Sequence, residues 1–426
     1  MCNTRKHFLL FFAFYVMCVF GIAQNEINSP YSSFGLGNLS PRTNIISSSM
    51  GSVGYALQNP YYINFKNPAA YAAFDSLSFI ADVSMSLINH QLRTDRQEQS
   101  GTFAQLGYLA IGLPVLKVWR TSVGIMPHSD VGYAIIDERP DVEDFGKTVN
   151  LYRGAGGLQL LYWGNAFKLA KGLTLGVNLS YLFGSIHKTS FTENEIPLGF
   201  NFMFVDSRHL DGIYVSGGLQ YQATAKEKHH LGIGAVYENA IKVWSRENLI
   251  VLRYAGKYSP NYNFDTVRVE IGDRNFVTMP QMVGAGLSYG YKDRLLVATD
   301  FTWQNWQRFS MTQSKDSLID NFIAAIGVQY TPNPASSKYH NKINFRAGTR
   351  FSSGYFVINE KPISEFAISV GFGFPIRTFN TRSSVNIMFE YSRLGTLQRN
   401  LILQNYFKLS FSFILQEKWY QRRKLE

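Results

Sequence analysis

The feature that most constrains this chain is a repeated alternation of apolar and small polar residues. In residues 173–181 the odd positions hold Leu, Leu, Val, Leu and Tyr, whereas the even positions hold Thr, Gly, Asn and Ser. Residues 407–415 repeat the pattern with Phe and Leu against Lys and Ser. Successive side chains of a β-strand point to opposite faces, so a period of two predicts strands with one apolar and one polar face. The chain is therefore predicted to be all-β.

The composition of the polar face indicates which face is buried. It is rich in Gly, Ser, Asn, Thr and Ala, as at Ala367, Ser369 and Gly371. The solvent face of a soluble sheet would carry more Lys and Glu, whereas small residues suit a crowded interior. The apolar runs reach about ten residues, the length that a tilted strand needs to cross a bilayer. We therefore favour a membrane barrel, with its apolar face toward lipid, over a soluble sandwich.

About fourteen segments alternate in this way. They centre on residues 77–87, 103–113, 118–132, 150–163, 172–186, 210–223, 230–244, 280–290, 294–304, 321–331, 342–352, 363–374, 382–392 and 405–415. Short links occur at 114–117, 168–171, 225–229 and 291–293, and long polar links at 134–149, 187–209 and 245–279. Short turns at one end and long loops at the other are typical of outer-membrane barrels. The sequence predicts a 14-stranded antiparallel transmembrane β-barrel of a Gram-negative outer membrane, with both termini periplasmic.

The first residues are interpreted as a secretory signal peptide, residues 1–23. Arg5 and Lys6 form a charged start, the apolar run 8–20 follows, and Gly-Ile-Ala precedes Gln24. A retained membrane anchor is the alternative, but the run is short for a span.

Removal of this signal would remove both cysteines, Cys2 and Cys18, so neither a disulfide nor a thiol site is expected. Arg5 and Lys6 are two of the 41 Lys and Arg residues, so the mature chain would carry 39 against 30 acidic residues, a net charge of +9. These basic residues are scattered and the chain is expected to be exported. We therefore exclude nucleic acid as a partner.

The segment from Met50 to Asp75 differs from the strands that follow. Its two Asn-Pro pairs, at 59–60 and 67–68, cannot lie inside a helix, because proline lacks an N–H and pushes the preceding residue toward extended conformations. Its apolar residues are nevertheless too many for a free linker. We expect this segment to be buried in the lumen, which divides the mature chain into a plug or hatch at 24–75, a barrel at 76–416 and a basic periplasmic tail at 417–426.

The glycine-containing run into Asn67, Pro68 and Ala69 resembles the hatch motif of the FadL/OmpP1 family of outer-membrane transport proteins, Bacteroidota-type members in particular. A segment before the barrel and fourteen strands are also similar to that family. The resemblance implies that the hatch plugs the lumen from the periplasmic side. It also implies that a kink in the third strand opens a lateral path for hydrophobic cargo. Pro127 and His128 match that kink by position, although Pro127 could simply bend the strand near its outer end.

The predicted lumen face is mostly small and polar, with charged residues such as Asp82, and this is unlike a fatty-acid pocket. An apolar cluster in the lumen would need residues from several strands and from the hatch. The candidate lumen contacts are Phe65, Tyr71, Ile80, Asp82, Leu109 and Met388.

No enzyme, cofactor or metal site is expected. Adjacent His229 and His230 would point to opposite faces of a strand and could not bind one ion in regular geometry. The sequence contains no G-x-S-x-G, H-E-x-x-H or G-x-x-x-x-G-K-[ST] motif.

Two functions remain open. The first is passive uptake of small hydrophobic compounds, such as fatty acids or aromatics, with lateral release. The alternative is a non-transporting structural subunit of an outer-membrane secretion or barrel-assembly complex. The expected partners are outer-membrane lipid and lipopolysaccharide, and either a hydrophobic cargo or other outer-membrane proteins.

Overall fold

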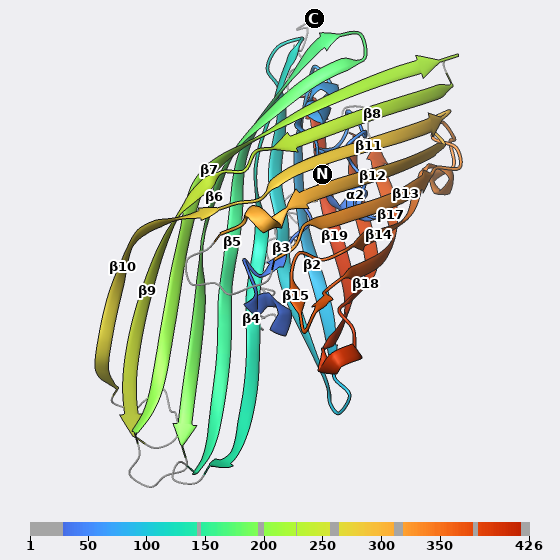
Figure 1. Cartoon of the computed structure of the whole chain (residues 1–426). Coiled ribbons are helices and arrows are strands. Elements are labelled where there is room, and N and C mark those ends of the chain that lie inside the picture. The colour runs from blue at the N-terminus through green and yellow to red at the C-terminus, as the bar shows by residue number, and fades with distance from the viewer. Residues whose placement is uncertain are drawn as a thin grey trace, which may run out of the picture.

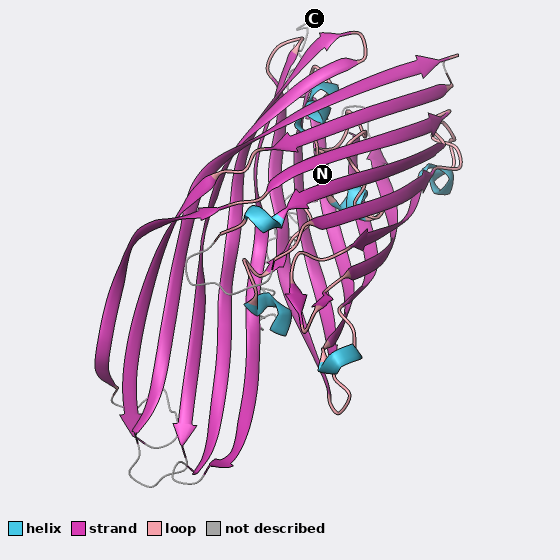
Figure 2. Ribbon diagram, in the orientation of Figure 1, coloured by secondary structure: helices cyan, strands magenta, loops and turns pink. Residues whose placement is uncertain are grey.

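A closed antiparallel sheet forms the body of the molecule (Figures 1 and 2). The computed structural model describes residues 29–142, 146–194, 200–226, 228–255, 264–310, 318–377 and 382–418. The predicted signal peptide and residues 419–426 of the predicted tail lie outside the described residues. The strands of the wall are β2 (Ser78–Arg93), β3 (Glu98–Pro114), β4 (Trp119–Val142), β5 (Gly146–Ala170), β6 (Leu173–Asn194), β7 (Phe200–Ala225), β8 (His229–Glu238), β9 (Lys242–Ala255), β10 (Asp265–Thr278), β11 (Gln281–Tyr291), β12 (Leu295–Asn305), β13 (Asn321–Tyr330), β14 (Asn344–Ser352), β17 (Glu365–Arg377), β18 (Arg382–Leu394) and β19 (Leu403–Lys418).

Two barrel strands are each interrupted once. Strand β7 pairs along its length with both β8 and β9, so these two are successive parts of one strand. Strands β10 and β11 are likewise the two parts of the next strand, because β10 pairs with β9 and β11 pairs with β8. The wall therefore has fourteen antiparallel strands, as predicted, and pairing of β19 with β2 closes it.

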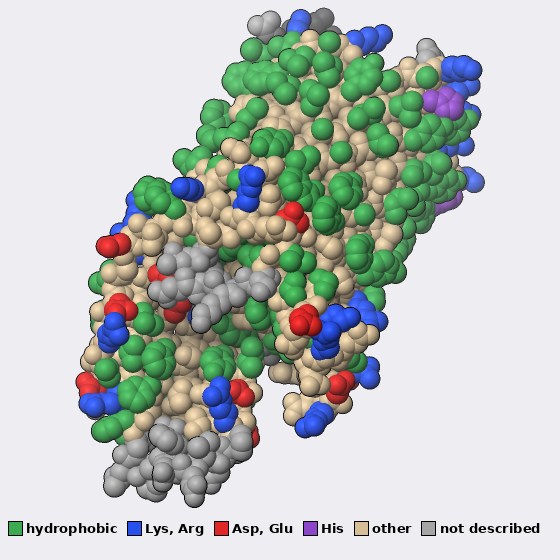
Figure 3. All heavy atoms as spheres, in the orientation of Figure 1, with side chains coloured by type: hydrophobic (Ala, Val, Ile, Leu, Met, Phe, Trp, Pro, Cys, Tyr) green, Lys and Arg blue, Asp and Glu red, His purple; other side chains and the backbone are tan. Residues whose placement is uncertain are grey.

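The two faces of the wall follow the sequence pattern. On β6, for example, Asn178 and Ser180 are buried toward the lumen, whereas Leu179 and Tyr181 are exposed on the outside. Apolar side chains cover much of the visible outer face (Figure 3). An apolar exterior and a lumen of small and polar residues are the arrangement expected of a barrel in lipid.

The two ends of the barrel differ. At one end, which we call the tight-turn end, most strands are joined by short connections and β19 ends. At the other, the long-hairpin end, strands β4, β5, β6, β7, β9 and β10 extend far beyond the rest as a tall partial wall (Figure 1). Three short 3₁₀ helices and a small hairpin lie in other connections: η3 (Trp306–Arg308), η4 (Tyr339–Lys342), η5 (Gln398–Asn400), and β15 (Val357–Ile358) with β16 (Lys361–Pro362).

The long polar loops predicted at 134–149, 187–209 and 245–279 are wrong. Strands run through most of these residues and form the tall wall. On β10, residues 265–270 are all exposed, so both faces of this hairpin meet solvent. The segment still alternates, with Val267, Val269 and Ile271 on one face, but the other face carries charged residues such as Arg268 and Glu270, and this charge made the stretch resemble a polar loop.

The prediction for Leu109 is also wrong. Its side chain is 48% exposed on the outer face, as is that of its neighbour Ile111 at 46%. The register with β2 shifts at Gly107, because Ser84 pairs with Tyr108 and Met85 with Leu106. This bulge inserts one residue and reverses which side chains of β3 face inward.

The segment before β2 lies inside the barrel. Its short elements are η1 (Pro30–Ser33), β1 (Asn38–Leu39), α2 (Ile45–Ser48) and η2 (Pro68–Ala73). Tyr31, Ile46, Met50, Ile63 and Tyr71 of this hatch are buried in the same apolar cluster as lumen residues of the wall. No helix among the described residues is long and apolar enough to span a bilayer.

Candidate functional site

The Asn-Pro-Ala motif begins the last helix of the hatch. The Asn67 side-chain oxygen accepts a hydrogen bond from the amide of Ala69 at 3.0 Å, and Pro68 is the first residue of η2. Proline suits this position because the first amides of a helix have no partner within the helix. The Asn67 amide group donates to the carbonyl oxygen of Tyr55 at 2.8 Å, so the motif also ties two parts of the hatch together. All three motif residues are buried.

Glycines of the wall make room for the hatch backbone. A Cβ atom at Gly234 would lie 1.8 Å from the carbonyl oxygen of Tyr55, and one at Gly176 would lie 2.2 Å from the carbonyl carbon of Pro68. A Cβ atom at Gly348 would lie 2.1 Å from the carbonyl carbon of Met50. Any side chain at these positions would displace the hatch. Sequence reasoning noted the small residues of the polar face but did not identify which of them receive the hatch.

A buried ion pair fixes the middle of the hatch to β12. The Lys66 ammonium lies 3.0 Å from Oδ2 of Asp300, whose side chain is almost fully buried. The same oxygen accepts hydrogen bonds from the amides of Gly54 at 2.7 Å and Tyr55 at 3.1 Å. Burial lowers the pKa of Lys66, and the nearby Asp300 only partly opposes this desolvation. One carboxylate of the wall thus binds three groups of the hatch.

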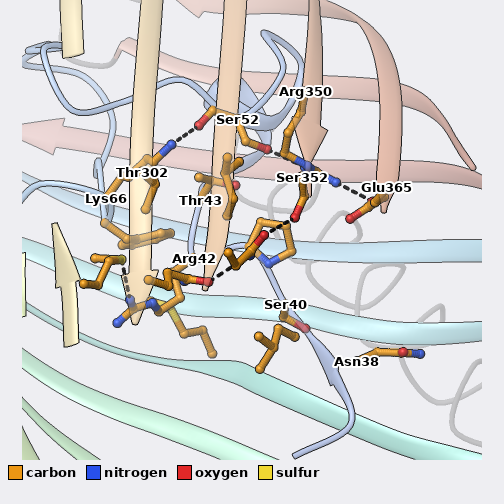
Figure 4. A pocket seen from close by; sticks show the side chains of 18 of the residues that line it. Asn38, Ser40, Arg42, Thr43, Ser52, Lys66, Thr302, Arg350, Ser352 and Glu365 are labelled. Atoms are coloured by element: carbon orange, nitrogen blue, oxygen red, sulfur yellow. Dashed lines mark hydrogen bonds and ion pairs between the residues drawn. The ribbon is translucent and has the colours of Figure 1, made fainter. Parts of the chain in front are cut away.

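A cavity of about 330 Å³ lies between the hatch and the wall (Figure 4). Arg42 of the hatch forms an ion pair of 2.7 Å with Glu238 of β8. Arg350 of β14 contacts Glu365 at 2.8 Å and donates to the hydroxyl of Ser52 at 2.9 Å. The charged residues that line the cavity are Arg42, Lys66, Arg350 and Lys408 together with Asp130, Glu238, Glu365 and Glu390. The cavity is therefore lined by equal numbers of cationic and anionic side chains among the described residues.

Of the predicted lumen contacts, only Phe65 and Tyr71 line this cavity. The Phe65 ring meets Tyr108 edge-on at 4.8 Å, and Tyr71 stacks on Tyr162 at 6.4 Å. The other inward-facing candidates are buried in the lumen away from the cavity: Ile80, Asp82 and Met388.

The wall is split between β3 and β4. These two strands pair only from Pro114 with Arg120 to Leu109 with Ile125, at the tight-turn end. Pro127 lies just beyond this last pair, and β4 then bulges at His128, because Pro127 pairs with Gln159 and Ser129 with Leu158. Proline cannot donate to a strand ladder, so it suits a position where pairing ends. The structure thus places Pro127 and His128 where the third barrel strand leaves the second.

Hatch residues occupy the edge of β4 that β3 leaves free. Strand β1 pairs with β4 through Asn38 with Asp130, and the amide of Ser29 donates to the carbonyl of Gly132 at 2.7 Å. Across the split, the Gln105 side chain donates to Asp130 at 2.7 Å. The hatch therefore covers one side of the split. On the other side, residues 98–108 of β3 pair only with β2 among the described residues.

The remaining polar candidates form no site. Among the described residues, no group of three or more His, Cys, Asp or Glu is placed to hold a metal ion. His229 contacts the hydroxyl of Tyr289 at 2.8 Å, whereas His230 contacts Thr224 at 3.2 Å.

Comparison with known proteins gives a family and a fold. The family model described as BamG matches residues 4–426. The fold is similar to the Pseudomonas putida toluene transporter TodX (TM-score 0.60, 15% identity, 90% of this chain and 100% of that one). It is also similar to a Pseudomonas aeruginosa FadL homologue (0.57, 13%, 90% and 100%) and to the Ralstonia pickettii toluene transporter TbuX (0.55, 13%, 91% and 100%). At these identities the likeness concerns the fold, a FadL-like outer-membrane barrel. No curated protein sequence matches the chain.

Proposed function

Because this chain belongs to the BamG family, we propose that it is a structural subunit of a barrel-assembly complex in the outer membrane. This preference reverses the order of the two functions that the sequence left open, in which uptake came first. In the complex the barrel would act as a fixed partner for other subunits rather than as a channel.

The observation that carries the proposal is the attachment of the hatch around the barrel. Besides Asp300 of β12 and Glu238 of β8, the wall contributes Gln220 of β7, which donates to the carbonyl of Tyr55 at 2.7 Å. Gln416 of β19 donates to the carbonyl of Pro60 at 3.3 Å, and Arg120 of β4 to that of Phe74 at 3.1 Å. Displacing the hatch would break buried hydrogen bonds and ion pairs to strands on all sides. A lumen sealed in this way supports a structural role better than passage through it.

In this proposal the tight-turn end faces the periplasm, and the tall wall rises on the outer surface of the cell. Short periplasmic turns and longer extracellular connections are the usual arrangement of outer-membrane barrels. The tall wall would then present a large surface of mixed charged and apolar residues outside the membrane, available to partner subunits or to their substrates.

Co-purification from native outer membranes tests this function. The full chain, tagged in a connection of the tight-turn end and extracted in mild detergent, is expected to elute with other barrel-assembly subunits at constant stoichiometry. Elution as a lone barrel or as its homo-oligomer would contradict the proposal. A tagged unrelated barrel of similar abundance is the control for non-specific capture.

The split and the cavity favour passage of hydrophobic compounds as a second candidate. The cavity reaches Phe103 and Gln105 of β3 and Met126 of β4, so it extends to the split. Two proteins of similar fold are described as toluene transporters. Flux of radiolabelled toluene into vesicles containing the purified chain, above that into empty vesicles, would support this candidate; equal flux would remove it.

A further inference from the structure

The tight-turn end carries an almost uniform charge. Exposed lysines project from the connections β3–β4, β5–β6, β7–β8 and β11–β12; they are Lys117, Lys168, Lys171, Lys226, Lys228 and Lys292. Lys338, Arg382 and Lys418 continue the series at β13–β14, at β17–β18 and at the end of β19. We call this series the basic rim. The acidic residues described at the same end are few: Asp75, Asp293 and Glu417.

The long-hairpin end has a different charge pattern. There exposed carboxylates such as Asp95, Glu98 and Asp265 are interspersed with the cations. Some of these cations form ion pairs, as Arg274 does with Asp211 at 3.0 Å and Arg399 with Glu360 at 2.7 Å, whereas others, such as Arg96 and Arg246, form none among the described residues. No cation of the basic rim forms an ion pair with a carboxylate in the described part of the chain. The rim is thus a ring of cations with few carboxylates among the described residues near it, and Figure 3 shows Lys, Arg and His side chains at this end.

Apolar side chains at the same connections locate the rim relative to the membrane. Leu77, Leu116 and Leu169 are 60%, 60% and 56% exposed, and they lie within a few residues of Lys117, Lys168 and the start of β2. Such residues favour lipid over water, so the connections themselves lie at the membrane surface.

Aromatic side chains near the ends of the strands also indicate that these connections lie at the membrane surface. Tyr221, Tyr289 and Tyr330 are exposed on the outer face, each within a few residues of a tight connection. Tyrosine and tryptophan girdles mark the interfaces of membrane barrels. A lysine just beyond such a girdle lies at the level of the lipid phosphates, with its apolar stem along the hydrocarbon boundary.

From this geometry we propose that the basic rim binds the headgroups of anionic phospholipids in the leaflet that surrounds the tight-turn end. The charges are distributed around the circumference, which matches a ring of lipid better than a single docking face. The proposal does not depend on whether the barrel serves as an assembly subunit or as a channel.

Native mass spectrometry of the full chain in detergent tests the proposal. The probes are dioleoyl phosphatidylglycerol and dioleoyl phosphatidylcholine, which differ in headgroup charge. The wild type is expected to bind the anionic lipid more tightly. In the variant K117Q/K168Q/K171Q/K226Q/K228Q/K292Q this preference should fall by about tenfold or more, because each basic residue near an anionic surface adds attraction.

A matched variant removes six exposed cations of the long-hairpin half: R93Q/R96Q/K242Q/R246Q/R308Q/R393Q. Its lipid preference should stay within about twofold of the wild type, because these residues lie away from the girdle of the tight-turn end. Heat-dependent migration on gels, a property of closed barrels, checks that both variants fold. Equal binding of the two lipids by the wild type would overturn the proposal. That result is expected if the rim binds an acidic protein instead of lipid. An equal loss of preference in both variants would also overturn it.

Discussion

The substitution Asp300→Ala should loosen the hatch without opening the barrel wall. It removes the carboxylate that binds Lys66 and the amides of Gly54 and Tyr55. Removing one partner of a buried ion pair costs about 3–5 kcal/mol, because the other charge stays buried and unpaired. The two amides lose their acceptor as well, which adds to the cost. If the seated hatch loses only the lower value, about 3 kcal/mol, the population of molecules with a displaced hatch should rise by at least about 100-fold.

Cysteine labelling measures that population. The mature chain is expected to contain no cysteine, so a single Ser47→Cys gives one reactive site. Ser47 is fully buried in α2, and its hydroxyl has no hydrogen-bond partner among the described residues, so the exchange removes no observed contact. A maleimide reagent can reach this thiol only when the hatch leaves its seat. The labelling rate reports the displaced population as long as the hatch returns faster than it reacts.

Two comparisons make the result decisive. Asp211→Ala removes a carboxylate from an exposed ion pair with Arg274, which is worth at most about 1 kcal/mol, and should leave the labelling rate unchanged. The double variant D300A/K66M removes both charges and should recover part of the wild-type protection, because the unpaired charge is gone while the amides of Gly54 and Tyr55 still lack their acceptor. A rise of less than about fivefold in D300A would refute the idea that this carboxylate anchors the hatch.

Three further predictions use the same assay. Gly234→Val should displace the hatch and expose the thiol introduced by Ser47→Cys, because a Cβ atom at this position would overlap the Tyr55 carbonyl. Gly217→Val should not, because nothing lies within 4 Å of a Cβ atom there. Equal labelling of the two variants would contradict the idea that wall glycines make room for the hatch. Asn67→Ala should raise labelling by about 10- to 100-fold through loss of the helix cap and of the bond to Tyr55; no change would show that the motif does not hold the hatch. Burial lowers the pKa of Lys66 in the seated hatch, so the displaced state binds more protons between that pKa and the ordinary value. Protection, corrected for thiol ionisation, should therefore increase as pH rises through this window in the wild type and not in K66M; identical slopes would contradict this.

The sequence predicted the barrel because lipid and lumen impose opposite requirements on the two faces of each strand. Along β6 the contrast between Leu179 and Ser180 is visible without any knowledge of the neighbouring strands. The tall wall was missed because charged residues such as Arg268 and Glu270 made these stretches resemble polar loops, although Val267 and Val269 alternate with them. The wrong assignment of Leu109 came from the bulge at Gly107, which only the pairing with β2 reveals.

The hatch motif was recognisable, but its attachments were not. Asn67 and Pro68 have local signatures of a helix start, whereas Asp300 meets Gly54 across 246 positions of sequence. Nothing near Asp300 in the chain marks it as the residue that binds Lys66. The split between β3 and β4 likewise depends on where pairing ends, and Pro127 alone left a simple bend equally possible.

The position of the hatch in the chain has a consequence for how the molecule is built. Residues 29–77 precede β2, and β2 pairs with β19, so the seam of the barrel joins the first and last strands to be synthesised. The hydroxyl of Ser29 donates to Gln404 on β19 at 2.8 Å, across 375 positions of sequence. The wall thus closes around a segment that was made before any of it.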